Sequence, residues 1–164
     1  MMVGIVGRVR KRLPSECLTH GKNTRYPNKK GIAAMNGFSS NPIATSEQFK
    51  NALLALRDKN LPESHFAMLR AQCRAKDSTI TSPQLATAAG YENYNAANLQ
   101  YGTLAFNLAS AIAFIPTDRH ADGSCCWWTT LSYTMEGHTE EGTGHFQFIM
   151  RPELVQALRD MRWA

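Results

Sequence analysis

The sequence predicts an α+β protein, and three observations support this. Apolar residues recur at helical spacing in five segments after residue 45. Residues 125–135 and 145–150 alternate between two faces, which is the period of a β-strand, and a polar loop joins them. From residue 62 the order is helix, short strand, helix, turn, long helix, β-hairpin, C-terminal helix. This order is that of a winged helix-turn-helix-like core.

Charge divides the chain of 164 residues into two parts. Residues 1–31 carry eight basic side chains and one acidic side chain, a net charge of +7, whereas residues 32–164 have a net charge of −2. We therefore expect residues 1–45 to be a basic, loop-rich N-terminal extension and residues 46–164 to be the winged-helix-like domain. A concentrated basic arm is typical of nucleic-acid binding. The alternative is a solubilising tail.

The first helix of the domain is predicted from its start. Thr45 and Gln48 fit a capping box, and apolar residues then fall on one helical face as far as Asn60. A second helix is expected to begin at Pro62-Glu63, with its apolar stripe at Phe66, Leu69 and Cys73. Residues 78–80 follow as one short strand.

The next two helices form the expected helix-turn-helix. Thr81 and Gln84 fit a second capping box, and Gly90 ends that helix. Either Asn93 or Asn95 then caps a long helix that runs to about Ala113. From their spacing, Leu99, Phe106 and Ala113 are predicted to share its apolar face, with Leu108 and Ile112 beside it. Gly102 costs about 1 kcal/mol relative to alanine in a helix, and we expect it to mark close backbone packing.

The β-hairpin is predicted from the two alternating segments. Residues 125–135 form its first strand, and residues 145–150 form the second, with Phe146, Phe148 and Met150 on one side. Adjacent residues of a strand face opposite sides, so one of Trp127 and Trp128 is expected in the core. The other is exposed or covered by a flanking element. Pro152-Glu153 begins the last helix.

The functional hypothesis is double-stranded DNA binding without catalysis. The side chains expected to contact phosphate lie in the arm: Arg8, Arg10, Lys11, Arg12, Arg25, Lys29 and Lys30. Tyr26, in the same arm, is also expected to bind the nucleic acid. Those expected to approach bases lie on the long helix: Asn95, Asn98, Gln100 and Tyr101. Residues 82–113 contain no Lys or Arg. Either the basic arm supplies the electrostatic attraction to phosphate, or the winged helix is a scaffold or a protein-binding surface.

Residues 80–105 carry a pattern that resembles a known module. The match is L-A-x-A-x-G-Y-x-N-Y-x-x-x-N-L-x-Y-G-x-L, and residues 144–158 look like the end of the same module. The module is found at the front of bacterial HNH-type restriction endonucleases. In addition, residues 25–29 are similar to a Y-x-x-K motif from restriction enzymes that read modified DNA.

The resemblance implies a DNA-sensing or targeting module of a restriction or phage-defence system, acting on unmodified or modified DNA. No HNH nuclease sequence follows in this chain, so cleavage is not implied. The second hypothesis is a small protein-binding inhibitor or adaptor in phage–host conflict, an anti-defence protein. Its motivation is the uncharged recognition helix and the acidic loop with Glu136, Glu140 and Glu141.

An enzyme is the least favoured interpretation. It would depend on His138 and His145 beside the acidic loop, and a solvated hairpin loop explains these residues better. Cys17-x-x-His20 supplies only half of a zinc spacing. We therefore expect no cofactor and no metal. No apolar run reaches the roughly 18 residues of a membrane span, and the expected location is the cytoplasm, with no membrane partner.

Overall fold

The computed structural model describes residues 40–135, 139 and 143–164, all within one compact unit, Ala34–Ala164. These residues form an α+β fold, as predicted, with five α-helices and a small antiparallel sheet. The helices are α1 (Ser46–Arg57), α2 (Glu63–Arg74), α3 (Ser82–Ala89), α4 (Tyr94–Ala111) and α5 (Pro152–Asp160). The strands are β1 (Thr79–Thr81), β2 (Ser132–Tyr133) and β3 (Gln147–Met150), and two 3₁₀ turns are η2 (Lys76–Ser78) and η3 (Trp127–Thr130).

Local capping determines where two of the helices begin, and both predicted capping boxes are confirmed. Before α1, the Thr45 amide donates to Gln48 Oε1 at 2.8 Å, and the Gln48 amide donates to Thr45 Oγ1 at 3.2 Å. Thr81 and Gln84 repeat this arrangement before α3. Each box satisfies amide donors that have no partner inside the helix.

The sheet has the strand order β1-β3-β2, and both pairs are antiparallel. Ile80 pairs with Phe148, and Ser132 pairs with Met150, so these side chains share the buried face. On the outer edge of β1, the amide of Thr79 donates to Lys76 O, and that of Thr81 donates to Gln84 Oε1. The predicted positions of Phe148 and Met150 on one side are confirmed.

The prediction of one continuous strand over residues 125–135 is wrong. This segment contains the 3₁₀ turn η3, and only Ser132 and Tyr133 join the sheet. The reason is that residues 128–132 are buried consecutively, which a tight turn permits and a half-exposed strand does not. The sequence alternates between two sets of side chains here, but buried and exposed residues do not alternate in the structure.

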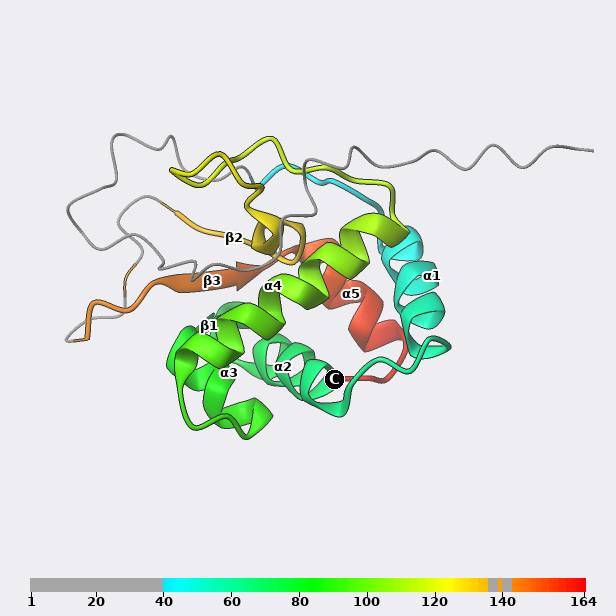
Figure 1. The fold of residues 1–164 in the computed structure, drawn as a ribbon. Coiled ribbons are helices and arrows are strands. Elements are labelled where there is room, and N and C mark those ends of the chain that lie inside the picture. Colours follow the sequence, from blue (N-terminus) through cyan, green and yellow to red (C-terminus); the bar gives the residue numbers. More distant parts are fainter. Residues whose placement is uncertain (1–39, 136–138, 140–142) are drawn as a thin grey trace, which may run out of the picture. The chain divides into compact units, whose positions relative to one another are not determined.

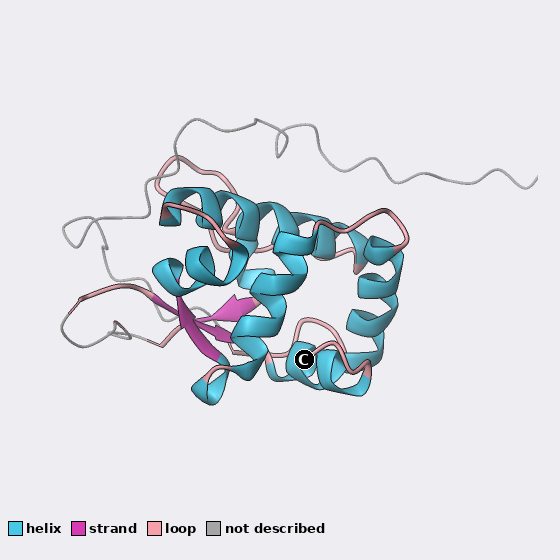
Figure 2. Cartoon of the chain, turned by 90° about the horizontal axis from the view of Figure 1, so that it is seen from below, coloured by secondary structure: helices cyan, strands magenta, loops and turns pink. Residues whose placement is uncertain are grey.

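The long helix α4 is the centre of the domain (Figure 1). It packs against α3, η3, α1 and α2, with the sheet and α3 toward one end and α1 toward the other. Figure 2 shows the three strands together at one side of the helices. None of the described helices has both the length and the apolar character needed to cross a membrane.

Arg151 joins three parts of the fold just before α5. Its side chain is buried, and Nε donates to Thr129 O at 2.8 Å while Nη1 donates to Asn41 O at 2.8 Å. Burial lowers the pKa of this guanidinium, and the neighbouring Glu153 carboxylate opposes that shift. Arg151 therefore connects η3 and the segment before α1, through Asn41, to the start of α5.

Candidate nucleic-acid interface

The turn between α3 and α4 is held by backbone and side-chain contacts. Gly90 ends α3 with φ of 74°, in the left-handed region that glycine adopts without strain. Asn93 then caps α4, because its Oδ1 accepts from the Ala96 amide at 3.0 Å. Tyr91 donates its hydroxyl to Ser64 Oγ at 3.1 Å. The turn that leads into α4 is thus fixed relative to α2.

The buried face of α4 differs from the predicted one. It consists of Ala97, Asn98, Tyr101, Leu104, Ala105, Leu108 and Ala109. Leu99, expected inside, is 59% exposed, and Ala113 is exposed beyond the end of the helix. The helix is apolar on nearly every side, so spacing alone did not distinguish the inner face from the outer one.

Tyr101 is in the core and is not available to a base. It is fully buried, and its hydroxyl donates to Gln72 Oε1 at 2.7 Å and lies 2.6 Å from Ser132 Oγ. Gln72 Nε2 in turn donates to Ser132 Oγ at 2.9 Å and to Phe148 O at 3.1 Å. This network joins α2, α4, β2 and β3, and it corrects the expectation that Tyr101 approaches DNA.

Asn98 and Gln100 also face the protein. Asn98 is 7% exposed, and its Oδ1 has no hydrogen-bond partner among the residues that the structure describes. Gln100 Oε1 is 2.9 Å from Nε2 of the buried His65, which links α4 to α2. Of the four residues expected to approach bases, only Asn95 is exposed.

The solvent-facing side of α4 is formed by Asn95, Leu99, Gly102 and Thr103, which we call the α4 outer face. Asn95, Leu99 and Thr103 are exposed and follow one another at one turn each. The hydroxyl of Thr103 donates to Leu99 O at 2.9 Å, so its donor is satisfied within the helix. A Cβ added at Gly102 would meet nothing within 4 Å, so the close packing expected at this glycine does not occur within the described domain.

Aromatic side chains border the α4 outer face at both ends. The ring of Tyr94, which is 48% exposed, lies 6.2 Å from the ring of His145 on the chain leading into β3. Toward the C-terminal half, Trp127 packs edge-on against Phe106 with ring centroids 4.9 Å apart. Trp128 is the buried tryptophan and contacts Phe146 and Phe148. The N-terminal half of α4 is thus open to solvent at Asn95 and Leu99, and it lies beside the chain that leads into β3.

Positive charge is absent from this region of the sequence. No Lys or Arg occurs between Lys76 and Arg119, which includes α3 and α4, or between Arg119 and Arg151, which includes the hairpin. The residues of the arm that are predicted to bind DNA lie outside the described residues: Arg8, Arg10, Lys11, Arg12, Arg25, Tyr26, Lys29 and Lys30.

The cysteines of the described region belong to the packed core. Cys73, Cys125 and Cys126 are buried, and burial, with the nearby Asp118 carboxylate, raises the pKa of Cys126 to about 12. No cluster of three or more His, Cys, Asp or Glu fit for a metal ion occurs within residues 40–135, 139 and 143–164. Cys17, His20, His138, Glu140 and Glu141 lie outside these ranges.

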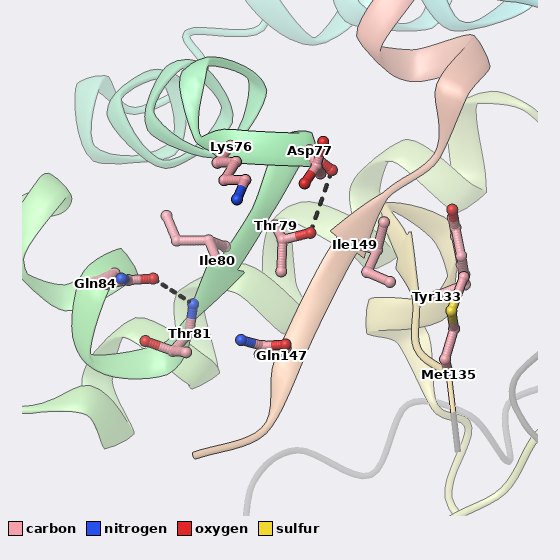
Figure 3. A pocket seen from close by; sticks show the side chains of 10 residues that line it. All are labelled: Lys76, Asp77, Thr79, Ile80, Thr81, Gln84, Tyr133, Met135, Gln147 and Ile149. Carbon is pink, nitrogen blue, oxygen red and sulfur yellow. Dashed lines mark hydrogen bonds between the residues drawn. The ribbon is translucent and has the colours of Figure 1, made fainter. Parts of the chain in front are cut away.

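A separate hollow of about 430 Å³ lies on the outer face of the sheet (Figure 3). Its lining consists of Lys76, Asp77, Thr79, Ile80, Thr81, Gln84, Tyr133, Met135, Gln147 and Ile149. None of the residues predicted to contact DNA lines it. Two of its polar groups are occupied locally, because Gln84 accepts from the Thr81 amide and the Thr79 hydroxyl donates to Asp77 O.

Comparison with protein-family models, characterised proteins and solved structures found no match for this chain.

Proposed function

We propose that the domain is a winged helix-turn-helix and that the chain is a non-enzymatic DNA-binding module of a restriction or defence-related system. In this proposal α3 and α4 are the helix-turn-helix, α4 is the recognition helix, and the β2–β3 hairpin is the wing. Two observations support this assignment: the element order from α2 to α5, and the strand order β1-β3-β2. The resemblance of residues 80–105 to restriction-enzyme modules supports the biological setting.

The observation that carries the proposal is the exposure of the N-terminal half of α4 beside the hairpin. Recognition helices contact base edges with their N-terminal residues. In this chain, that part of the helix presents Asn95 and Leu99 to solvent, and Tyr94 lies beside His145. Asn95 has an amide that can pair with two atoms of an adenine edge.

Phosphate contact is assigned to the basic arm. Neutralising phosphates releases counterions and supplies most of the sequence-independent affinity for DNA. Since α3, α4 and the hairpin have no cation, this attraction comes from the eight Lys and Arg side chains of residues 1–31. Affinity and base preference are therefore separated along the chain.

The test is fluorescence anisotropy of the full chain with short duplexes, unmodified and modified, over a salt series. Wild type is expected to bind with a steep salt dependence. Reversing the charges of Arg8, Arg10, Lys11 and Arg12 should weaken binding to all duplexes alike and reduce the salt slope by roughly 0.9 for each phosphate that is no longer neutralised. Reversal of Arg57 and Lys59 near the end of α1 is the matched control. Failure of wild type to bind any duplex at low salt would refute the proposal.

A second function is favoured by the chemistry of the α4 outer face: a protein-binding inhibitor or adaptor. Leu99 and Tyr94 are large, exposed and uncharged, which suits a protein interface better than a phosphate surface. This hypothesis predicts little DNA binding and a stoichiometric protein complex from host lysate. The Leu99→Asp variant should lose that complex, whereas Ile115→Asp, at another exposed apolar position, should keep it.

A further inference from the structure

The α4 outer face combines one hydrogen-bonding amide with one apolar side chain. The side-chain amide of Asn95 forms no hydrogen bond with a described residue, whereas the Thr103 hydroxyl already donates to Leu99 O. Leu99 is the most exposed of the large apolar side chains in the described domain. This face therefore offers a bidentate amide and a methyl-rich side chain but no charge.

The major groove contains one natural partner for each of these groups. Adenine presents the N6 donor and N7 acceptor that an Asn amide matches, and thymine presents the C5-methyl group, the only apolar group on that edge. Asn95 and Leu99 are four residues apart, about 6 Å along the helix. This separation is roughly two base-pair steps of about 3.4 Å each.

Gly102 leaves the backbone of α4 without a side chain on its exposed side. It lies between Leu99 and Phe106 along the exposed side of α4, and a methyl group there would touch nothing within the described domain. Glycine in a helix interior lowers stability relative to alanine, and no close packing within the described domain requires a glycine at this position. A bare backbone at this point allows the wall of a groove to approach α4 closely.

From these features we infer that α4 reads a short A·T-containing site, with Asn95 on adenine and Leu99 on the thymine methyl group. The inference rests on the proposed function, because it requires α4 to lie in the major groove. It deepens that function by naming the base pairs read. Phosphate contacts remain with the basic arm.

The experiment uses the full chain and a change of one methyl group in the DNA. A duplex preferred by wild type is selected from a random pool. A series of duplexes is then made in which one thymidine at a time is replaced by deoxyuridine, which lacks the C5-methyl group. At the contacted position, loss of the methyl group should weaken wild-type binding about fourfold, from about 0.8 kcal/mol per buried carbon group. Leu99→Ala should bind the thymine duplex about fourfold more weakly and should no longer distinguish thymine from deoxyuridine.

The matched control is Ile115→Ala, which truncates another exposed apolar side chain, in the loop after α4, and should keep the wild-type preference. Equal wild-type affinity for thymine and deoxyuridine duplexes would overturn the inference and leave DNA binding standing. A Leu99→Ala variant that keeps the full preference would also overturn it. Absence of any wild-type binding at low salt would instead remove the proposed function, and this inference with it.

Discussion

The hydroxyl oxygen of Tyr101 lies 2.6 Å from Oγ of Ser132, inside the core, and this contact joins α4 directly to β2. Gln72 completes the network from α2. A polar network that links the exposed helix to the hairpin strand fixes the angle between them, because each group has a partner only in one arrangement. The surface that α4 presents is therefore set by a contact on its opposite side.

Removal of the Tyr101 hydroxyl is expected to destabilise the domain. Tyr101→Phe leaves the buried Gln72 amide without a donor to its oxygen, which costs about 1–3 kcal/mol. Urea denaturation measures the change. Tyr94→Phe is the matched control, since Tyr94 is 48% exposed, and its effect should stay within about 0.5 kcal/mol. Similar midpoints for the two variants would contradict a stabilising role for the network.

The cap of α4 is assigned to Asn93 and not to Asn95. Asn93→Ala removes the acceptor for the Ala96 amide and should cost about 1 kcal/mol of unfolding free energy. Asn95→Ala, two residues later and exposed, should leave stability nearly unchanged. Thermal unfolding of the two variants separates these roles, and a reversed order of stabilities would assign the cap to Asn95.

Gly102→Ala is expected to stabilise the domain. The added methyl group meets no atom of the described residues within 4 Å apart from its own helix, and the helix gains about 0.5–1 kcal/mol of stability from the loss of glycine. Gly123 also has open space, but its φ of 84° strains any other residue, so Gly123→Ala should destabilise. If α4 enters a groove, Gly102→Ala should raise the unfolding midpoint and lower DNA affinity together.

Alkaline pH is expected to destabilise the fold through Cys126. Burial raises its pKa to about 12 in the folded chain, whereas the unfolded thiol ionises near its ordinary value. Between these two values deprotonation favours the unfolded chain, so the free energy of unfolding falls as pH rises. Cys126→Ala should show a shallower fall than wild type from pH 8 upward in urea titrations. Parallel curves for the two proteins would contradict the assignment.

How far the sequence predicts this fold depends on the range of the interaction. Both capping boxes and the Gly90 stop are local, and they are found where the sequence places them. The inner face of α4 is not determined by local sequence, because apolar residues occur on nearly every side of the helix. Contacts with α2 and the sheet determine that Tyr101 is buried and Leu99 is exposed. The buried role of Tyr101 depends on Gln72 and Ser132, 29 and 31 residues away. Of the four residues that the sequence predicted to approach bases, Asn95 alone is exposed, and its contact with DNA stays a prediction.

The outer edge of β1 has a further consequence, for behaviour at high concentration. Both outward amides of this strand already have acceptors, Lys76 O for Thr79 and Gln84 Oε1 for Thr81. An incoming strand would find no amide donor on that edge. The capping box of α3 therefore also removes an amide donor that an added strand would need, which disfavours edge-to-edge aggregation along β1.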